Sequence, residues 1–231
     1  MTYSILKNSI SKKEVGYQFQ TTGYIDTEAA FGPNSRTKLE DDKIPCFTPD
    51  LRFELYEKSK LTNIVRASNI NAKGFLMDAD TKCIFEHSTL PPNYKFYDAS
   101  VLDHDGIVNP YFWMHIISND YDIIDFKQSV FRVHKFPILL KSDKIEEMPT
   151  IFIKDKKDYE RKKNELFFED KYLVIDVLKI VDTNHFDMIH FGNIDINTVF
   201  ISEKLANLLK KEKITGITIT PTDKLVNLAD E

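Results

Sequence analysis

The stretch that most constrains the fold is residues 198–221, which read TVFISEKLANLLKKEKITGITITP. Its apolar run at 199–201 predicts a strand, and the hydroxyl of Ser202 can accept a hydrogen bond from the first turn of a helix. Leucines then recur at helical spacing between charged residues, which predicts an amphipathic helix. Gly216 permits a turn, and the alternation at 217–220 predicts a second strand. We therefore expect a strand, a capped helix, a turn and a strand.

A second stretch, residues 74–101, resembles the first and reads GFLMDADTKCIFEHSTLPPNYKFYDASV. At a constant offset of 124 residues, its apolar run at 75–77 aligns with 199–201, and Asp78 aligns with the cap Ser202. Capped helices that follow strands are common, so chance is the alternative explanation. Because cap, apolar face and turn agree at one offset, we interpret the pair as an internal duplication, with units at about 74–101 and 198–221.

Strand patterns outnumber helix patterns in the rest of the chain. Helices are expected after Ser59 and Asp155, which can cap them. Strands are expected at 3–6, 17–22, 51–56, 151–153, 172–181 and 186–191, with a β-meander over 107–133 whose strands are 111–117, 121–126 and 129–133. Because regular helical crossovers do not separate these strands, we predict an α+β fold: mixed or antiparallel sheets, a few short helices and two related strand–helix–strand halves. No linker divides the chain, which favours a single domain over 1–231.

Composition narrows the class of protein. Hydrophobic residues make up 42% of the chain and the formal net charge is −5, as in an ordinary globular protein with a core. Neither half is basic, which disfavours nucleic-acid binding. Cys46 and Cys83 lack the spacing of a zinc or disulfide framework, so we expect buried free thiols in a reducing compartment. No segment has the length and apolar character of a membrane span or a signal peptide, so we expect a cytoplasmic protein that makes no membrane contact.

One polar cluster contains the ligand types of a divalent metal site, namely Asp182, His185, Asp187 and His190. If residues 186–191 form a strand, His185 and His190 lie about 16 Å apart, too far to share one ion. We therefore favour a structural role for the cluster. A metal-assisted hydrolase remains the alternative function.

Three further features have a structural and a functional interpretation. The triplet Asp103, His104 and Asp105 has the composition of an exposed turn, although a histidine between carboxylates can act as a base. His115 follows an aromatic run and is expected to be a hydrogen-bonded core residue. A deep apolar cavity lined by Trp113 would instead indicate a small-ligand binder or scaffold.

The helix expected after Asp155 gathers charges of both signs. Its basic residues are Lys156, Lys157, Arg161, Lys162 and Lys163, and its acidic residues are Asp155, Asp158, Glu160 and Glu165. This interleaving is typical of a solvated helix face. Neither a glycine-rich phosphate loop nor a GxSxG elbow occurs in the sequence. We therefore predict no catalytic residue, no cofactor site and no metal ligand.

The order of several motifs resembles a bacterial family first catalogued as a domain of unknown function and now grouped with the immunity proteins of polymorphic toxin systems. Its C-terminal signature is matched by Phe200-Ile201, Ser202-Glu203-Lys204-Leu205, Leu208-Leu209 and Ile214-Thr215-Gly216. Its middle part is matched by Lys60-Leu61-Thr62, Gly74-Phe75-Leu76, Leu90-Pro91, Phe96-Tyr97, Tyr111-Phe112-Trp113-Met114-His115 and Ile124-Asp125-Phe126 with Ser129. The resemblance covers residues 48–221 and leaves the first 45 residues unmatched.

This resemblance implies a cytoplasmic, non-catalytic inhibitor that binds and neutralises a cognate toxin protein in interbacterial competition. It transfers no active-site residue, and the toxin-contacting residues are expected in variable loops. The acidic balance of the chain suits a basic toxin domain such as a nuclease. Neither the toxin nor the oligomeric state follows from the sequence.

Overall fold

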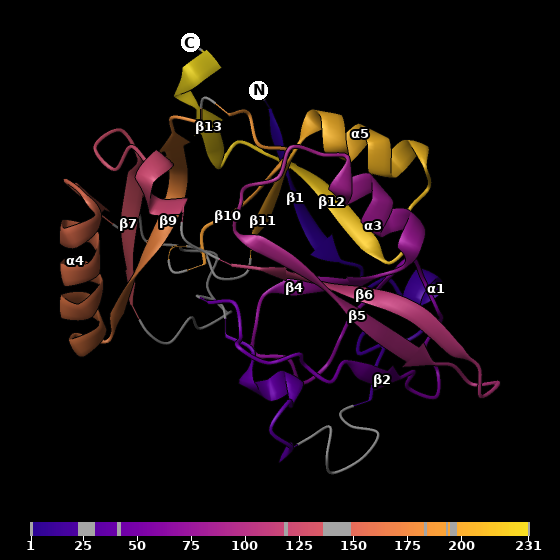
Figure 1. Cartoon of the computed structure of the whole chain (residues 1–231). Helices are drawn as coiled ribbons and strands as arrows, with labels where there is room; N and C mark the ends of the chain where they lie inside the picture. Colours follow the sequence, from indigo (N-terminus) through magenta and orange to yellow (C-terminus); the bar gives the residue numbers. More distant parts are fainter. Residues whose placement is uncertain are drawn as a thin grey trace. The chain divides into compact units, whose positions relative to one another are not determined.

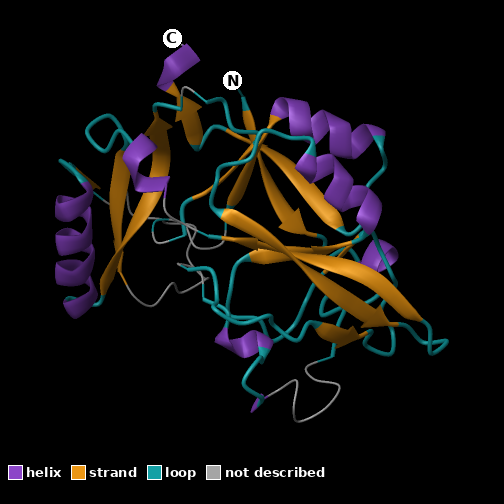
Figure 2. Cartoon of the chain, in the orientation of Figure 1, coloured by secondary structure: helices purple, strands orange, loops and turns teal. Residues whose placement is uncertain are grey.

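A computed structural model describes residues 2–22, 31–40, 43–117, 120–135, 149–182, 184–192, 194 and 198–230. The chain forms two compact units (Figure 1). The smaller unit contains Met1–Tyr3, Asp120–His185 and Thr222–Glu231, and the larger unit contains Ser4–Asn119 and Phe186–Pro221. Strands predominate in both, as Figure 2 shows in orange, with a few short helices in purple. The predicted α+β class is confirmed, whereas the single domain stays a prediction.

The larger unit contains a five-stranded sheet in the order β2-β5-β6-β4-β3. Its strands are β2 (Arg52–Glu54), β3 (Ile64–Val65), β4 (Gly74–Met77), β5 (Tyr94–Leu102) and β6 (Val108–Ile116). The long β5–β6 hairpin is antiparallel, with Tyr97 opposite Trp113, and β4 runs antiparallel on the other side of β6. Only β2, paired with β5, runs parallel among the described pairs of this sheet. The sheet is therefore mixed, as predicted.

A second sheet of the larger unit has the order β10-β11-β1-β12. Its strands are β1 (Tyr3–Asn8), β10 (Met188–His190), β11 (Val199–Ser202) and β12 (Ile217–Thr222). The larger unit also contains α1 (Lys12–Val15), the 3-10 helix η1 (Arg36–Lys38), α3 (Ala79–Glu86) and α5 (Glu203–Lys211).

The two stretches that the sequence relates to each other fold alike. One is β4–α3–β5 and the other is β11–α5–β12. In each, the two strands flank a third strand from elsewhere in the chain: β4 and β5 flank β6, and β11 and β12 flank β1. Asp78 accepts a hydrogen bond from Thr81 N, and Ser202 accepts one from Leu205 N, so both predicted caps are present. The common architecture is shown, and its origin by duplication stays a prediction.

Helices α3 and α5 contact each other over a shared apolar core (Figure 1). Helix α5 buries Leu205, Ala206 and Leu209, the stripe expected from its leucine spacing, and α3 contributes the buried Phe85. The remaining buried members of this core come from both sheets: Leu6, Ile64, Phe75, Met77, Met114, Ile116, Met188, Val199 and Ile201. The two similar stretches are thus joined by one core.

The smaller unit contains a sheet in the order β13-β9-β7-β8. Its strands are β7 (Val130–Lys135), β8 (Thr150–Ile151), β9 (Lys171–Ile180) and β13 (Leu225–Asn227), accompanied by α4 (Lys156–Phe168) and the 3-10 helices η2 (Asp120–Ile123) and η3 (Leu228–Asp230). The rings of Phe126, Phe131 and Tyr159 pack together and form an aromatic core, with centroids 5.7–6.2 Å apart. Tyr159 is the buried residue of α4.

Four local predictions are wrong. Residues 17–22 form no strand, since only Thr21 makes an isolated bridge there, to Leu55. Ser59 caps no helix, because Ile64 and Val65 extend and pair with β4. Residues 120–123 form a 3-10 helix instead of a strand. The meander is wrong as well, because β7 pairs with β8 and β9 and not with β6. In the segment after Ser59 and in the meander, long-range strand pairing overrides a local pattern.

The sequence also predicts a turn at 118–120 and a charged loop at 141–150. Residues 118–119 of the turn and most of the loop lie outside the described part of the chain. Among the helices that the structure describes, none combines the length and the apolar character needed to cross a bilayer.

Candidate functional site

Asp187 is the centre of a buried polar cluster in the larger unit. Ser202 Oγ donates to its Oδ1 at 2.6 Å, and Lys204 Nζ donates to its Oδ2 at 2.8 Å. The backbone N–H of Thr89 donates to the same Oδ2 at 2.9 Å. The serine and the lysine of the C-terminal signature therefore converge on one carboxylate, which ties the start of α5 to the loop that follows α3.

Hydrogen bonding keeps this carboxylate ionised. Burial raises the pKa of Asp187, but the bonds from Lys204 and Ser202 outweigh burial and hold the pKa below its usual value. Its side chain is only 1% exposed, whereas that of Lys204 is 67% exposed, so the ion pair joins a buried carboxylate to a lysine at the surface. We infer that Asp187 positions the helix.

The other members of the proposed metal cluster have separate partners. The N–H of Asp182 donates to Asn227 Oδ1, and its Oδ1 accepts from Asn184 N. His190 is buried, with Nδ1 2.9 Å from the carbonyl oxygen of Thr198, whereas His185 is exposed. Across the described residues, no group of three or more His, Cys, Asp or Glu side chains is arranged to hold a metal ion.

His115 is the buried, hydrogen-bonded core residue that the sequence predicts. Its Nε2 lies 2.8 Å from the carbonyl oxygen of Glu40, to which it donates. Trp113 is 4% exposed and packs inside the second core of the larger unit. A Cβ on Gly74 would lie 2.6 Å from the Trp113 ring, so the indole rests directly on the backbone of β4. This close packing accounts for Trp113 without a ligand.

The triplet at 103–105 lies in the exposed turn of the β5–β6 hairpin, as predicted. The Asp103 carboxylate accepts bonds from Asn109 Nδ2 and from the N–H groups of Asp105 and Ile107. The bond from Asn109 contributes most to a lowered pKa of Asp103. His104 Nε2 lies 3.0 Å from the carbonyl oxygen of Ser59. These hydrogen bonds stabilise the turn, and none of them joins His104 to a carboxylate that could polarise it as a base.

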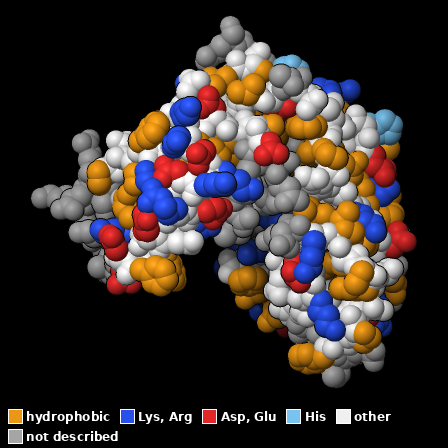
Figure 3. Space-filling model, turned by 60° about the vertical axis from the view of Figure 1, so that its left-hand side comes forward, with side chains coloured by type: hydrophobic (Ala, Val, Ile, Leu, Met, Phe, Trp, Pro, Cys, Tyr) orange, Lys and Arg blue, Asp and Glu red, His pale blue; other side chains and the backbone are white. Residues whose placement is uncertain are grey.

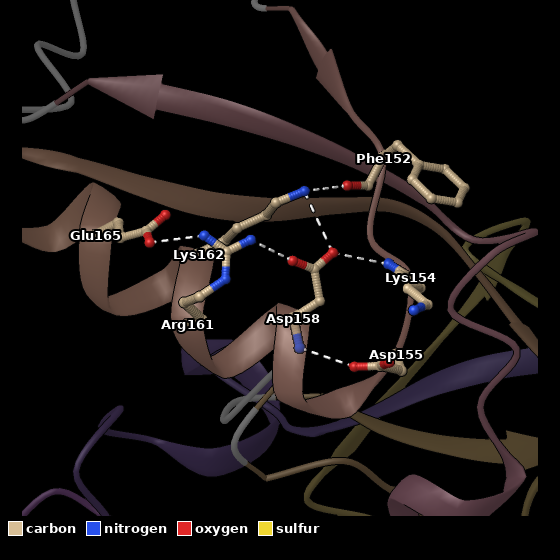
Figure 4. A network of polar contacts seen from close by, with 7 residues as sticks. All are labelled: Phe152, Lys154, Asp155, Asp158, Arg161, Lys162 and Glu165. Atoms are coloured by element: carbon tan, nitrogen blue, oxygen red, sulfur yellow. Dashed lines mark hydrogen bonds and ion pairs between the residues drawn. The ribbon is translucent and has the colours of Figure 1, made fainter.

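The charges of α4 are paired within the helix and its flanking loop (Figure 4). Arg161 donates to both Asp158 and Glu165, and Lys162 contacts Asp158 and the carbonyl oxygen of Phe152. The N–H of Lys154 contributes most to a lowered pKa of Asp158. On the face drawn in Figure 3, basic and acidic side chains are interspersed. The predicted solvated helix face is therefore observed.

A groove of about 530 Å³ lies beside α3 and α5 in the larger unit. Its lining residues are Asn63, Asp80, Cys83, Ile84, His87, Leu208, Glu212 and Ile214. Three residues of α3 and its C-cap residue His87 recur at the spacing of one helix face, so the groove runs along that face. Sequence analysis missed this site, although the i, i+3, i+4 and i+7 pattern from Asp80 to His87 is readable in the sequence.

Cys83 and His87 lie together in the groove but do not form a nucleophilic pair. Cys83 Sγ is 3.5 Å from His87 Nδ1, while the same Nδ1 is 2.7 Å from the carbonyl oxygen of Cys83. A carbonyl oxygen only accepts, so Nδ1 carries a proton and is not available to take one from the thiol. The prediction of buried thiols is wrong, since both Cys83 and Cys46 are exposed.

No protein-family model matches the chain, and no curated protein matches it. A functional assignment therefore depends on the ordered motifs of the sequence and on the geometry of the described residues.

Proposed function

We propose that this chain is an immunity protein, a cytoplasmic inhibitor that binds a cognate bacterial toxin in a stoichiometric complex and neutralises it. In this role the protein guards the producing cell and its siblings during interbacterial competition. It acts by occupying a surface of the toxin and performs no chemistry of its own.

The observation that carries the proposal is the ordered resemblance over residues 48–221, whose distant motifs contact one another. Asn63 Oδ1 accepts from Thr215 N at 2.9 Å, and Ile64 N donates to Thr215 O at 3.0 Å. A Cβ on Gly216 would lie only 1.8 Å from the carbonyl oxygen of Ile64. The Ile-Thr-Gly turn of the signature thus packs closely against the segment that follows Thr62 and forms hydrogen bonds with it. The signature turn and the segment beside the Lys60-Leu61-Thr62 motif therefore belong to one framework.

Two further contacts link the matched motifs. Tyr111 Oη donates to the carbonyl oxygen of Thr62 at 2.6 Å, and Trp113 packs on the backbone of Gly74. The signature residues Ser202 and Lys204 both bind Asp187. These residues build the framework, so toxin contacts are expected from exposed residues around it.

The polar clusters that could have suggested catalysis also favour a binding role. Asp187, His190 and Asp103 all make structural hydrogen bonds, and His87 binds the carbonyl oxygen of Cys83. Side chains used in this way support a binding role.

Co-expression with the toxin domain encoded by a neighbouring gene tests the proposal. We expect growth to be restored and a one-to-one complex to form at micromolar concentration, measured by size-exclusion chromatography with an inactivated toxin. Continued killing together with the absence of a complex would refute the proposal. An empty vector and an immunity protein of a different toxin are the controls.

A further inference from the structure

We propose that the groove beside α3 and α5 is a docking site for a cationic side chain, an arginine or a lysine, of a protein partner. The identity of that partner as the toxin rests on the proposed function, whereas the chemistry of the groove does not. Three features of the groove carry the inference.

The first feature is the apolar floor of the groove. Ile84, Leu208 and Ile214 line it and are half-buried. Arginine and lysine side chains bury their methylene stems on such apolar surface while their charged ends reach polar groups. A floor of this kind therefore fits a long basic side chain better than a short polar one.

The second feature is that the groove is lined by two acidic side chains and by no lysine or arginine. Asp80 and Glu212 are both exposed, and neither makes an ion pair with any residue that the structure describes. No lysine or arginine is among the lining residues. Lys82 of α3 lies on a different face, where it pairs with Glu86 and lies over the rings of Phe96 and Phe112. The two carboxylates thus complement a positive charge from outside the chain.

The third feature is the position of Glu212. It is the C-cap residue of α5, at the end where the helix dipole disfavours a carboxylate and favours the neighbouring Lys210 and Lys211. Asp80, in contrast, lies in the first turn of α3, where the dipole favours it. Glu212 therefore gains nothing from the dipole of its own helix, and its carboxylate lines the groove, where a basic side chain can reach it.

Cys83 lines the groove and provides a direct test in the full-length chain. The chain has two cysteines, so the substitution Cys46→Ser leaves Cys83 as its single thiol. Iodoacetamide alkylation of that thiol is timed by mass spectrometry with and without a hexa-arginine peptide. At a peptide concentration about ten times its Kd, we expect alkylation to slow about tenfold. Hexa-glutamate should leave the rate unchanged. An unchanged rate over the whole hexa-arginine titration would overturn the inference.

Charge reversal separates groove binding from general electrostatic attraction. Glu212→Lys and Asp80→Lys should weaken hexa-arginine binding about tenfold or more, since they place like charges together. Glu57→Lys and Asp105→Lys change the net charge by the same amount at exposed acids outside the groove and should weaken it less than about twofold. Glu212→Lys should keep or raise Tm, because it improves the end of α5. Equal effects of all four variants would overturn the inference.

The toxin assay distinguishes failure of this inference from failure of the proposed function. Loss of toxin affinity in Glu212→Lys, but not in Glu57→Lys, supports both. If hexa-arginine protects Cys83 but the chain does not neutralise the toxin, the groove still binds a cationic side chain and the proposed immunity function is refuted. The opposite result is full neutralisation by Glu212→Lys, with Cys83 equally reactive in the free chain and in the complex. It would support the immunity function and refute docking of the toxin in the groove.

Discussion

At the scale of single residues, the buried carboxylate of Asp187 stabilises the fold through its hydrogen bonds. Asp187 is buried, yet it is held ionised because Ser202, Lys204 and the N–H of Thr89 donate to it. A carboxylate in this setting contributes stability only while it keeps its charge, so it links folding to pH.

Asp187→Asn should lower the free energy of unfolding at pH 7 by about 2 kcal/mol, since bonds to a charged acceptor are lost in a buried place. The pKa of Asp187 is lowered in the folded chain, so the carboxylate's contribution is complete above the unfolded pKa. That contribution is lost as the pH falls below about 4 toward the folded pKa. The difference between wild type and variant should therefore shrink in urea denaturation at pH 3.

Asp105→Asn is the matched control for this prediction. Asp105 is exposed in the hairpin turn, so the control should differ little from wild type at either pH. If Asp187→Asn were as stable as wild type at pH 7, the stabilising role of the buried carboxylate would be wrong.

Residues whose role depends on their immediate neighbours could be predicted from the sequence. The caps Ser202, Asp78 and Asp155 accept bonds from backbone groups three residues on, which is a local property. The exposure of Cys83 could not be predicted, because it depends on what packs against one face of α3. The bond from Lys204 to Asp187 spans 17 residues and joins two elements, so no local pattern encodes it.

At the scale of elements, helices with a clear apolar stripe were predictable and strand partners were not. Helix α5 has its buried leucines where the 3.6-residue period places them. Strand β7 was predicted correctly as an extended segment, but its partner β9 begins 36 residues after β7 ends. Alternation of apolar and polar side chains specifies which face of a strand is buried, but it does not determine which strand lies beside it. The groove was missed for the same reason, since α3 and α5 come together only through tertiary packing.

The turn before β12 leaves no room for a side chain at Gly216. Gly216 has φ +85° and its α-carbon faces the carbonyl oxygen of Ile64 at a distance that leaves no room for a Cβ. Gly216→Ala should lower the free energy of unfolding by about 3 kcal/mol or more, because backbone strain and a steric clash add. Thermal and urea denaturation measure the loss.

Gly106→Ala provides the matched control for the turn. Gly106 has φ +76° but nothing within 4 Å of its would-be Cβ, so only backbone strain applies. We expect a loss of about 1 kcal/mol for this variant. Equal losses at the two glycines would show that the contact with Ile64 contributes nothing.

At the scale of the whole molecule, the two compact units have separate cores. The smaller unit is centred on Phe126, Phe131 and Tyr159, and the larger unit on the two clusters that include Phe85 and Trp113. Separate cores allow separate losses of stability, because cooperative unfolding follows packed units. The predicted single domain is therefore open to direct measurement.

Phe131→Ala should remove about 3–5 kcal/mol from the smaller unit, the usual cost of truncating a buried phenylalanine. Hydrogen exchange read by mass spectrometry should show faster exchange in peptides of β7 and β9, with protection of β5 and β6 unchanged. Phe85→Ala is the reciprocal control and should affect the larger unit. A uniform loss of protection in both variants would show that the two units unfold as one.

The position of β1 has a consequence for how the protein is made. This strand lies between β11 and β12, which come from the last part of the chain. A ribosome that adds about 5–20 residues per second needs roughly ten to forty seconds to synthesise the intervening segment. During that time β1 has neither of its neighbours in the sheet. The growing chain is thus exposed to mispairing until β11 and β12 are synthesised, and chaperone binding to nascent β1 would protect it.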